Sequence, residues 1–192
     1  MRQAGEQLQE AREDMRNISE SLQEEQVSQA LAAGSRAQEN LEELKDEFKE
    51  STSSQFSESM RQVRDAAREL AENQRNISEE LDRLQNEIAP TLDGSGNRQE
   101  VTEQYNRQQE DLEALMRDLR EITEDSETGE PTLHRKLYDL LRRQNQNETG
   151  ENLGVAKELV ERGFLDQAQQ MQPGLQQSLN ELADAVEEAA SS

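Results

Sequence analysis

Residues 63–88 read VRDAARELAENQRNISEELDRLQNEI, and this stretch decides the fold. Its apolar positions recur at alternating steps of four and three, the heptad spacing that gives a helix one apolar stripe. Glu, Arg, Gln, Leu and Ala fill most of the other positions, and all of them are good helix formers. The stretch therefore predicts a helix with one buried face. The positions on that face are Val63, Ala67, Leu70, Gln74, Ile77, Leu81, Leu84 and Ile88.

A similar stripe continues on the N-terminal side of this stretch. It slips once, because Ala30 follows Leu22 after eight residues instead of seven. Between residues 41 and 63 the stripe follows two periods of eleven, a spacing that locally unwinds a left-handed supercoil. We therefore predict one long amphipathic helical arm over residues 1–90. The serine-rich residues 51–54 are the place where a hairpin break competes with a continuous helix.

The second half of the chain has shorter apolar runs and clearer interruptions. Ala89-Pro90 ends the arm, and the Gly-rich segment that follows predicts a turn at 91–98. A second heptad run over 101–122 ends in a segment that reads as an acidic loop at 124–131. Residues 99–192 are therefore expected to form several shorter helices that fold back and pack on the arm.

The pattern predicts an all-α fold, an elongated antiparallel helical bundle or coiled coil with one long N-terminal arm and several shorter helices. A parallel dimer through the arm is the rival arrangement. Gly163 indicates a helix C-cap, and Pro173 fits the first turn of the last helix. The core seam is expected to include Leu8, Met15, Leu41, Phe48, Leu70, Leu81, Leu112 and Leu119.

Composition excludes several classes of protein. The chain has 192 residues, with 43 acidic and 21 basic side chains, a net charge of -22 and only 31% hydrophobic residues. This charge opposes the phosphate neutralisation on which nucleic-acid binding rests. No apolar run approaches the ~18 residues of a membrane span. Low hydrophobicity with high charge is also typical of disorder, so a stress-type hydrophilic helical protein is one alternative, although the regular stripe favours folded helices.

The residues needed for catalysis or metal binding are scarce. There is no Cys, and His134 is the only histidine. The many carboxylates lie on the polar faces of predicted helices, whereas acid–base catalysis needs them in a pocket that shifts their pKa values. The sequence also lacks a Gly-rich phosphate loop and a nucleophile motif. We therefore expect no enzyme activity, no cofactor and no metal site.

One basic patch interrupts the acidic surface. It consists of Arg135, Lys136, Arg142 and Arg143. Three uses remain open: docking of an acidic partner, offsetting the charge of a neighbouring helix, or a solvated face. A protein partner or self-association is expected for an amphipathic helical chain. Binding to a lipid surface is the alternative, which the acidic charge opposes because interfacial helices usually carry Lys and Arg.

Three phrases of the C-terminal region carry a family resemblance. They are KLYDLLR at 136–142, ELVERGFLDQA at 158–168 and LADAVEEAA at 182–190. Residues 99–190 resemble the helical region, a domain of unknown function, of large uncharacterised membrane-anchored proteins of planctomycete-type bacteria. The resemblance implies a fragment of such a protein, extracytoplasmic or periplasmic, and associated with the membrane only through segments absent from this chain. It carries over no catalytic residues. The function expected is therefore a non-enzymatic structural or protein-interaction module.

Overall fold

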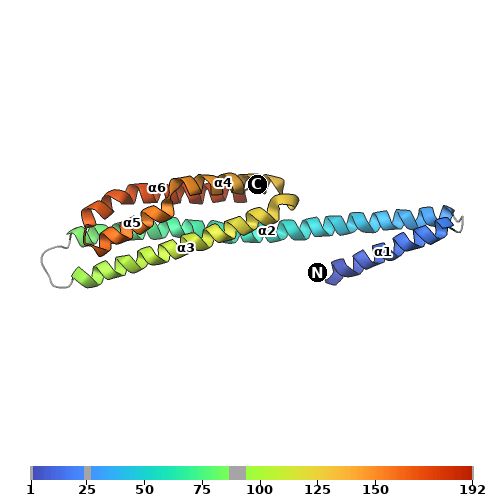
Figure 1. The fold of residues 1–192 in the computed structure, drawn as a ribbon, viewed down its shortest axis with the longest axis horizontal. Coiled ribbons are helices and arrows are strands. Elements are labelled where there is room, and N and C mark those ends of the chain that lie inside the picture. Colours follow the sequence, from blue (N-terminus) through green and yellow to red (C-terminus); the bar gives the residue numbers. More distant parts are fainter. Residues whose placement is uncertain (1, 24–26, 87–93, 192) are drawn as a thin grey trace. The chain divides into compact units, whose positions relative to one another are not determined.

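The computed structural model describes residues 2–23, 27–86 and 94–191. All regular structure in these ranges is helical, and the predicted all-α helical bundle is confirmed. The chain divides into two compact units, Met1–Gln55 and Phe56–Ser192, called unit 1 and unit 2 below. The helices, labelled in Figure 1, are α1 (Arg2–Gln23), α2 (Val27–Asn86), α3 (Gly94–Gly129), α4 (Pro131–Asn147), α5 (Thr149–Glu161) and α6 (Leu165–Ala190).

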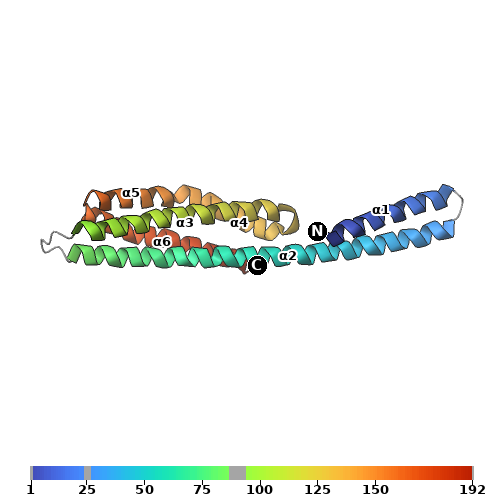
Figure 2. The ribbon, with the colours of Figure 1, turned by 90° about the horizontal axis from the view of Figure 1, so that it is seen from below.

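Unit 2 is an up-and-down bundle (Figures 1 and 2). The C-terminal part of α2 and the antiparallel α3 form two sides, and α6 forms another. Helices α4 and α5 follow one another along the remaining side, where each contacts both α3 and α6. Polar contacts join α2 to its neighbours: Gln108 of α3 donates from Nε2 to the carbonyl oxygen of Leu70 at 2.7 Å, and Arg68 Nη2 pairs with Glu187 Oε2 of α6 at 2.6 Å.

The inner face of α2 in unit 2 follows the heptad pattern. Each described position on the face predicted from residues 63–88 is buried. The largest of these, Leu70, Ile77 and Leu81, are 2% exposed or less. Each such side chain contributes on the order of 1.5–3 kcal/mol through removal of apolar surface from water. Unit 2 therefore holds a continuous apolar core.

The predicted single arm over residues 1–90 consists of two helices. α1 ends at Gln23 and α2 begins at Val27, with residues 24–26 outside the described ranges. The eight-residue step in the predicted stripe falls at this place, so the slip in the pattern coincides with the change of helix. α2 then continues without interruption through residues 51–54, which contain neither Gly nor Pro. Residues 94–98 of the turn predicted at 91–98 belong to α3, and residues 91–93 lie outside the described ranges.

α3 is also longer at its C-terminal end than predicted. It runs through most of the segment 124–131, which the sequence indicated as an acidic loop. Thr123 and Ser126 are buried there, and their hydroxyls donate to backbone carbonyls, Thr123 Oγ1 to Leu119 at 2.5 Å and Ser126 Oγ to Thr123 at 3.1 Å. These polar side chains are satisfied within the helix and therefore do not end it.

Two residues in the left-handed region join the last three helices. Glu148 has φ 51 at the junction of α4 and α5. Gly163, with φ 81, follows α5 in a Schellman motif: the Gly163 N–H donates to Val160 O at 3.0 Å, and the Phe164 N–H donates to Leu159 O at 2.8 Å. The cap predicted at Gly163 is confirmed.

Pro173 lies inside α6, whereas the sequence predicted it in the first turn of the last helix. The helix begins eight residues earlier because Leu165 and Ala168 are buried against the bundle and extend its apolar face. Packing of this face offsets the cost of about 3 kcal/mol that an internal proline imposes.

Candidate interaction surfaces

A regular stripe on α2 in unit 1 presents large apolar side chains to solvent. Its positions recur at alternating steps of four and three, the spacing of a coiled-coil seam. We call this set the open seam. It consists of Val27, Leu31, Gly34, Gln38, Leu41, Lys45 and Phe48. The exposed fractions of its large apolar members are 65% for Val27, 74% for Leu31, 36% for Leu41 and 68% for Phe48.

The buried stripe of the same helix segment is built from small residues. Ala30, Ala33 and Ala37 are 4–6% exposed, and Ala11 of α1 is equally buried at 5%. Alanines let two helix backbones approach closely, because no long side chain separates them. In unit 1 the alanine stripe therefore lies in the contact between helices, and the stripe with the larger side chains remains open.

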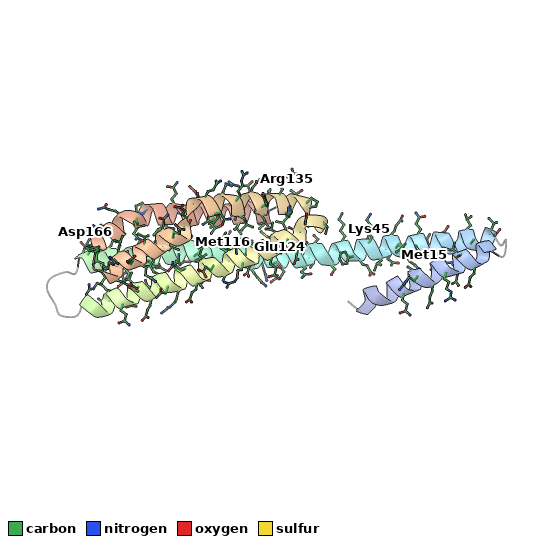
Figure 3. The ribbon with its side chains drawn as sticks, viewed as in Figure 1. Met15, Lys45, Met116, Glu124, Arg135 and Asp166 are labelled. Atoms are coloured by element: carbon green, nitrogen blue, oxygen red, sulfur yellow. The ribbon has the colours of Figure 1, made fainter. Side chains whose placement is uncertain are left out.

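A groove lies beside the open seam, within unit 1. It has a volume of about 380 Å³, and its sides come from α1 and α2. Figure 3 labels Met15 on α1 and Lys45 on α2, two of its lining residues. The full lining is Met15, Ile18, Gly34, Ala37, Gln38, Leu41, Glu42 and Lys45. Gly34, which has no side chain, and Ala37 leave room here that a bulky side chain from another molecule could fill.

The side of α2 next to the open seam is acidic. Glu39, Glu42 and Asp46 are exposed, and they follow the seam over two turns. Gln38 Nε2 donates to Glu42 Oε1 at 3.1 Å, while Glu39 and Asp46 form no hydrogen bond or ion pair with any described residue. The open seam therefore carries large apolar side chains with Gln38 and Lys45 between them, and an acidic rim of Glu39, Glu42 and Asp46 lies on one side of it, next to Lys49.

The predicted basic patch lies on α4, where Figure 3 labels Arg135. Lys136 Nζ donates to Glu188 O of α6 at 3.1 Å, whereas Arg143 Nε donates to Asp139 O of its own helix at 3.4 Å. Arg135 and Arg142 are exposed on either side of Tyr138, which is itself 58% exposed. Of the four residues, only Lys136 joins α4 to another helix in these contacts, whereas Arg135, Arg142 and Arg143 are exposed and the Arg143 bond stays within α4.

The structure separates the eight predicted seam residues into two groups. Leu70, Leu81, Leu112 and Leu119 are buried together in the core of unit 2, each 5% exposed or less. The expectation of burial is wrong for three residues of unit 1, because the alanine stripe takes the place between the helices. They are Met15 at 57% exposed, Leu41 at 36% and Phe48 at 68%. The side chain of Leu8 lies outside the described part of the structure.

A buried polar layer in unit 2 was not predicted. Gln172 of α6 donates from Nε2 to Tyr105 OH at 2.8 Å and accepts at Oε1 from Gln74 Nε2 at 2.7 Å. All three side chains are 3% exposed or less. Burial raises the pKa of the Tyr105 hydroxyl to about 12, while the Gln172 hydrogen bond acts in the opposite direction. The available signal was a Gln at a heptad position of an otherwise apolar stripe, as at Gln74 and Gln108.

Within the described ranges, no three side chains of His, Cys, Asp or Glu are grouped so that they could hold a metal ion. No helix in these ranges is both long and apolar enough to cross a bilayer. His134 Nδ1 lies 2.8 Å from the carbonyl oxygen of Thr123 and its ring stacks near Tyr138, with the ring centroids 6.4 Å apart. This histidine therefore links α4 to the end of α3.

Comparisons of the chain with models of protein families, with curated proteins and with solved structures found no match. The resemblance of residues 99–190 to helical regions of planctomycete-type membrane-anchored proteins stays a prediction.

Proposed function

We propose that this chain is a non-enzymatic interaction module whose open seam binds a helix of another protein. The observation that carries the proposal is the exposure of Leu31, Leu41 and Phe48 at heptad spacing in unit 1. An amphipathic helix that lays its apolar face against such a stripe is a recurring mode of recognition. Burial of these side chains would contribute on the order of 1.5–3 kcal/mol each, before the costs of association.

Unit 2 has a different part in the proposal. Its leucine-rich core is closed, and its exposed large apolar side chains, Tyr138, Val155 and Phe164, are not at heptad spacing. We assign it a structural role, in which it stabilises the C-terminal part of α2. Arg135 and Arg142 are a second, weaker candidate for contact with an acidic partner, since their guanidinium groups face solvent.

A lipid surface is the rival ligand for the open seam. The acidic rim at Glu39, Glu42 and Asp46 opposes it, because the cytoplasmic and bacterial bilayers that interfacial helices meet carry anionic lipid. Co-sedimentation with anionic and with neutral vesicles separates the two ligands. If the chain binds vesicles and Leu31→Asp abolishes that binding, the ligand of the open seam is a lipid surface and not a protein.

The direct test is site-specific photo-crosslinking in cells. A photoreactive phenylalanine analogue is placed at Phe48 of the open seam, and at Val155 of unit 2 as the matched exposed control. We expect a discrete protein adduct from position 48 that disappears when Leu41→Asp is added, and none from position 155. Equal adducts from both positions, or an adduct at 48 that survives Leu41→Asp, would contradict the proposal.

A further inference from the structure

We infer that the polar layer of Gln74, Tyr105 and Gln172 fixes the register of α2 against α3 and α6 in unit 2. Figures 1 and 2 show the C-terminal part of α2 running alongside these two helices. The inference goes beyond the proposed function and does not depend on it, because the layer lies in unit 2 and the open seam lies in unit 1.

The apolar core of unit 2 alone permits more than one register. The buried positions of α2 recur at alternating steps of four and three from Phe56 to Leu84, and those of α3 and α6 follow the same spacing. A slide of α2 by one heptad would therefore again bring apolar side chains level with apolar side chains. Burial of apolar surface is also non-directional, so it distinguishes such registers only weakly.

The helix whose register needs to be fixed is α2. Helices α3 to α6 are joined by short junctions, and α3 and α6 each contact both α4 and α5. The chain joins α2 to this group only through residues 87–93. A slide would therefore move α2 against the other four helices of unit 2 together.

The polar layer connects three helices through side chains. Gln74 Nε2 donates to Gln172 Oε1 at 2.7 Å, which joins α2 to α6. Gln172 Nε2 donates to Tyr105 OH at 2.8 Å, which joins α6 to α3, and to Ala168 O of its own helix at 2.6 Å. The three side chains of the layer are almost completely buried, so they depend on one another for their hydrogen bonds.

A slide of one heptad separates the members of the layer. In one direction it would bring Gln74 level with Leu112 and Leu179, and Leu81 into the layer. In the other direction it would bring Ala67 into the layer. Both slides break the bond between the two buried amides of α2 and α6, and a buried polar group without its partner is costly. The observed register is the one in which all three polar groups meet.

Two other buried glutamines of unit 2 do not select a register. Gln108 Nε2 donates to Leu70 O at 2.7 Å, and every turn of α2 offers an equivalent main-chain carbonyl. Gln144 Nε2 donates to Thr149 Oγ1 at 2.9 Å, within the junction of α4 and α5. Both serve as controls, because a change to Leu removes a buried amide and leaves the polar layer intact.

The distance between two spin labels tests the inference on the full chain. The chain has no Cys, so Glu72→Cys in α2 and Asp184→Cys in α6, both at exposed positions, carry the labels. Pulsed electron paramagnetic resonance measures the distance, and a slide of one heptad moves the label on α2 by about 10 Å along the bundle. We expect one distance in the otherwise unchanged chain, because the polar layer allows one register.

Removal of the layer should release the register. The triple variant Gln74→Leu, Tyr105→Phe and Gln172→Leu exchanges the layer for apolar side chains of similar size. We expect a second distance to appear while the urea midpoint stays equal or rises, because replacing all the partners by apolar groups is nearly neutral or stabilising. Gln108→Leu and Gln144→Leu should keep the single distance. A triple variant with only the original distance would overturn the inference, and so would a second distance in either control.

A swap variant gives an answer even where the triple variant does not fold. Gln74→Leu with Leu81→Gln moves the glutamine of α2 by one heptad. If the layer fixes the register, α2 should slide until the new amide meets Gln172, and the distance between the labels should shorten. An unchanged distance, or a chain that loses its helicity instead of sliding, would overturn the inference.

Discussion

In unit 2 the side chains that lie between the helices are mostly large, whereas in unit 1 they are alanines. Leu119 and Leu137 are completely buried in unit 2, while Leu31 and Phe48 are more than two-thirds exposed in unit 1. Both units have amphipathic helices rich in Glu, Gln and Arg. Heptad spacing alone therefore does not decide which stripe of a helix becomes buried. Residue size at each stripe, and the number of helices available to cover it, decide the outcome.

The largest expected difference between the units is in hydrogen exchange. Local opening free energies range from near zero to the global value, according to how much apolar surface an opening exposes. Amides near Ile77, in the core of unit 2, should therefore exchange at least about a thousandfold more slowly than amides near Leu41 in unit 1. Native-state exchange followed by mass spectrometry measures both. Equal protection across α2 would mean that the two units unfold as one, and the contrast between them would be wrong.

The second prediction contrasts two identical substitutions. Leu115→Asp places an unpaired carboxylate in the core of unit 2, where Leu115 is 1% exposed, and we expect a loss of about 4–5 kcal/mol or more with loss of helicity. Leu31→Asp, at a position that is 74% exposed, should change stability by less than about 0.5 kcal/mol. Urea unfolding followed by circular dichroism reports both values. Similar losses from the two variants would show that the open seam is buried in solution.

The third prediction uses the buried tyrosine of unit 2. The pKa of Tyr105 is about 12 in the folded protein, above its ordinary value of about 10, so the unfolded chain releases this proton first. The stabilisation is complete below about pH 10 and is lost as the pH rises toward 12, which amounts to about 2–3 kcal/mol. Tyr105→Phe should lack this loss between the two pH values. If urea unfolding of the two proteins has the same pH dependence, the layer is open to solvent.

The smallest effects are expected at the two left-handed residues of unit 2. Gly163→Ala should destabilise unit 2 by about 1 kcal/mol, because φ 81 is unfavourable for alanine and its Cβ would lie 3.1 Å from Arg98 Nη1. Glu148→Gly should stabilise it by up to about 1 kcal/mol, since glycine adopts φ 51 without steric strain. Chemical denaturation compares both with the wild type. The hydrogen exchange of unit 1 should be the same in both variants, and a change there would argue against two separate units.

Much of unit 2 could be predicted from the sequence. Residues 63–84 are buried at the heptad positions because their apolar side chains are large, regularly spaced and in phase over three heptads. Gly163 was identifiable because an αL cap has a strong residue preference. Gln172 shares its stripe with Ala168 and Leu175, so the same spacing would have located the third member of the polar layer.

Unit 1 could not be predicted in the same way. Val27, Leu31 and Leu41 form one stripe, and Ala30 and Ala37 form another beside it. The predicted stripe passed through Ala30 and then through Leu41 and Phe48, so it mixed the two stripes, and close approach of two helices buries only the alanines. The choice depends on which helices are present to cover each face, and this is a tertiary property. Pro173 was predicted in the first turn of a helix because proline favours that position. In the structure it lies inside α6, because packing of the whole helix outweighs the preference of one residue.

The polar layer also gives the protein an internal spectroscopic probe. The chain has no tryptophan and only two tyrosines, of which Tyr105 is fully buried and Tyr138 is largely exposed. In a Tyr138→Phe background, all tyrosine absorbance, emission and near-ultraviolet dichroism would come from one ring held by Gln172 at the centre of the bundle. The integrity of the core could then be followed optically, without a label, while a ligand is titrated onto the open seam.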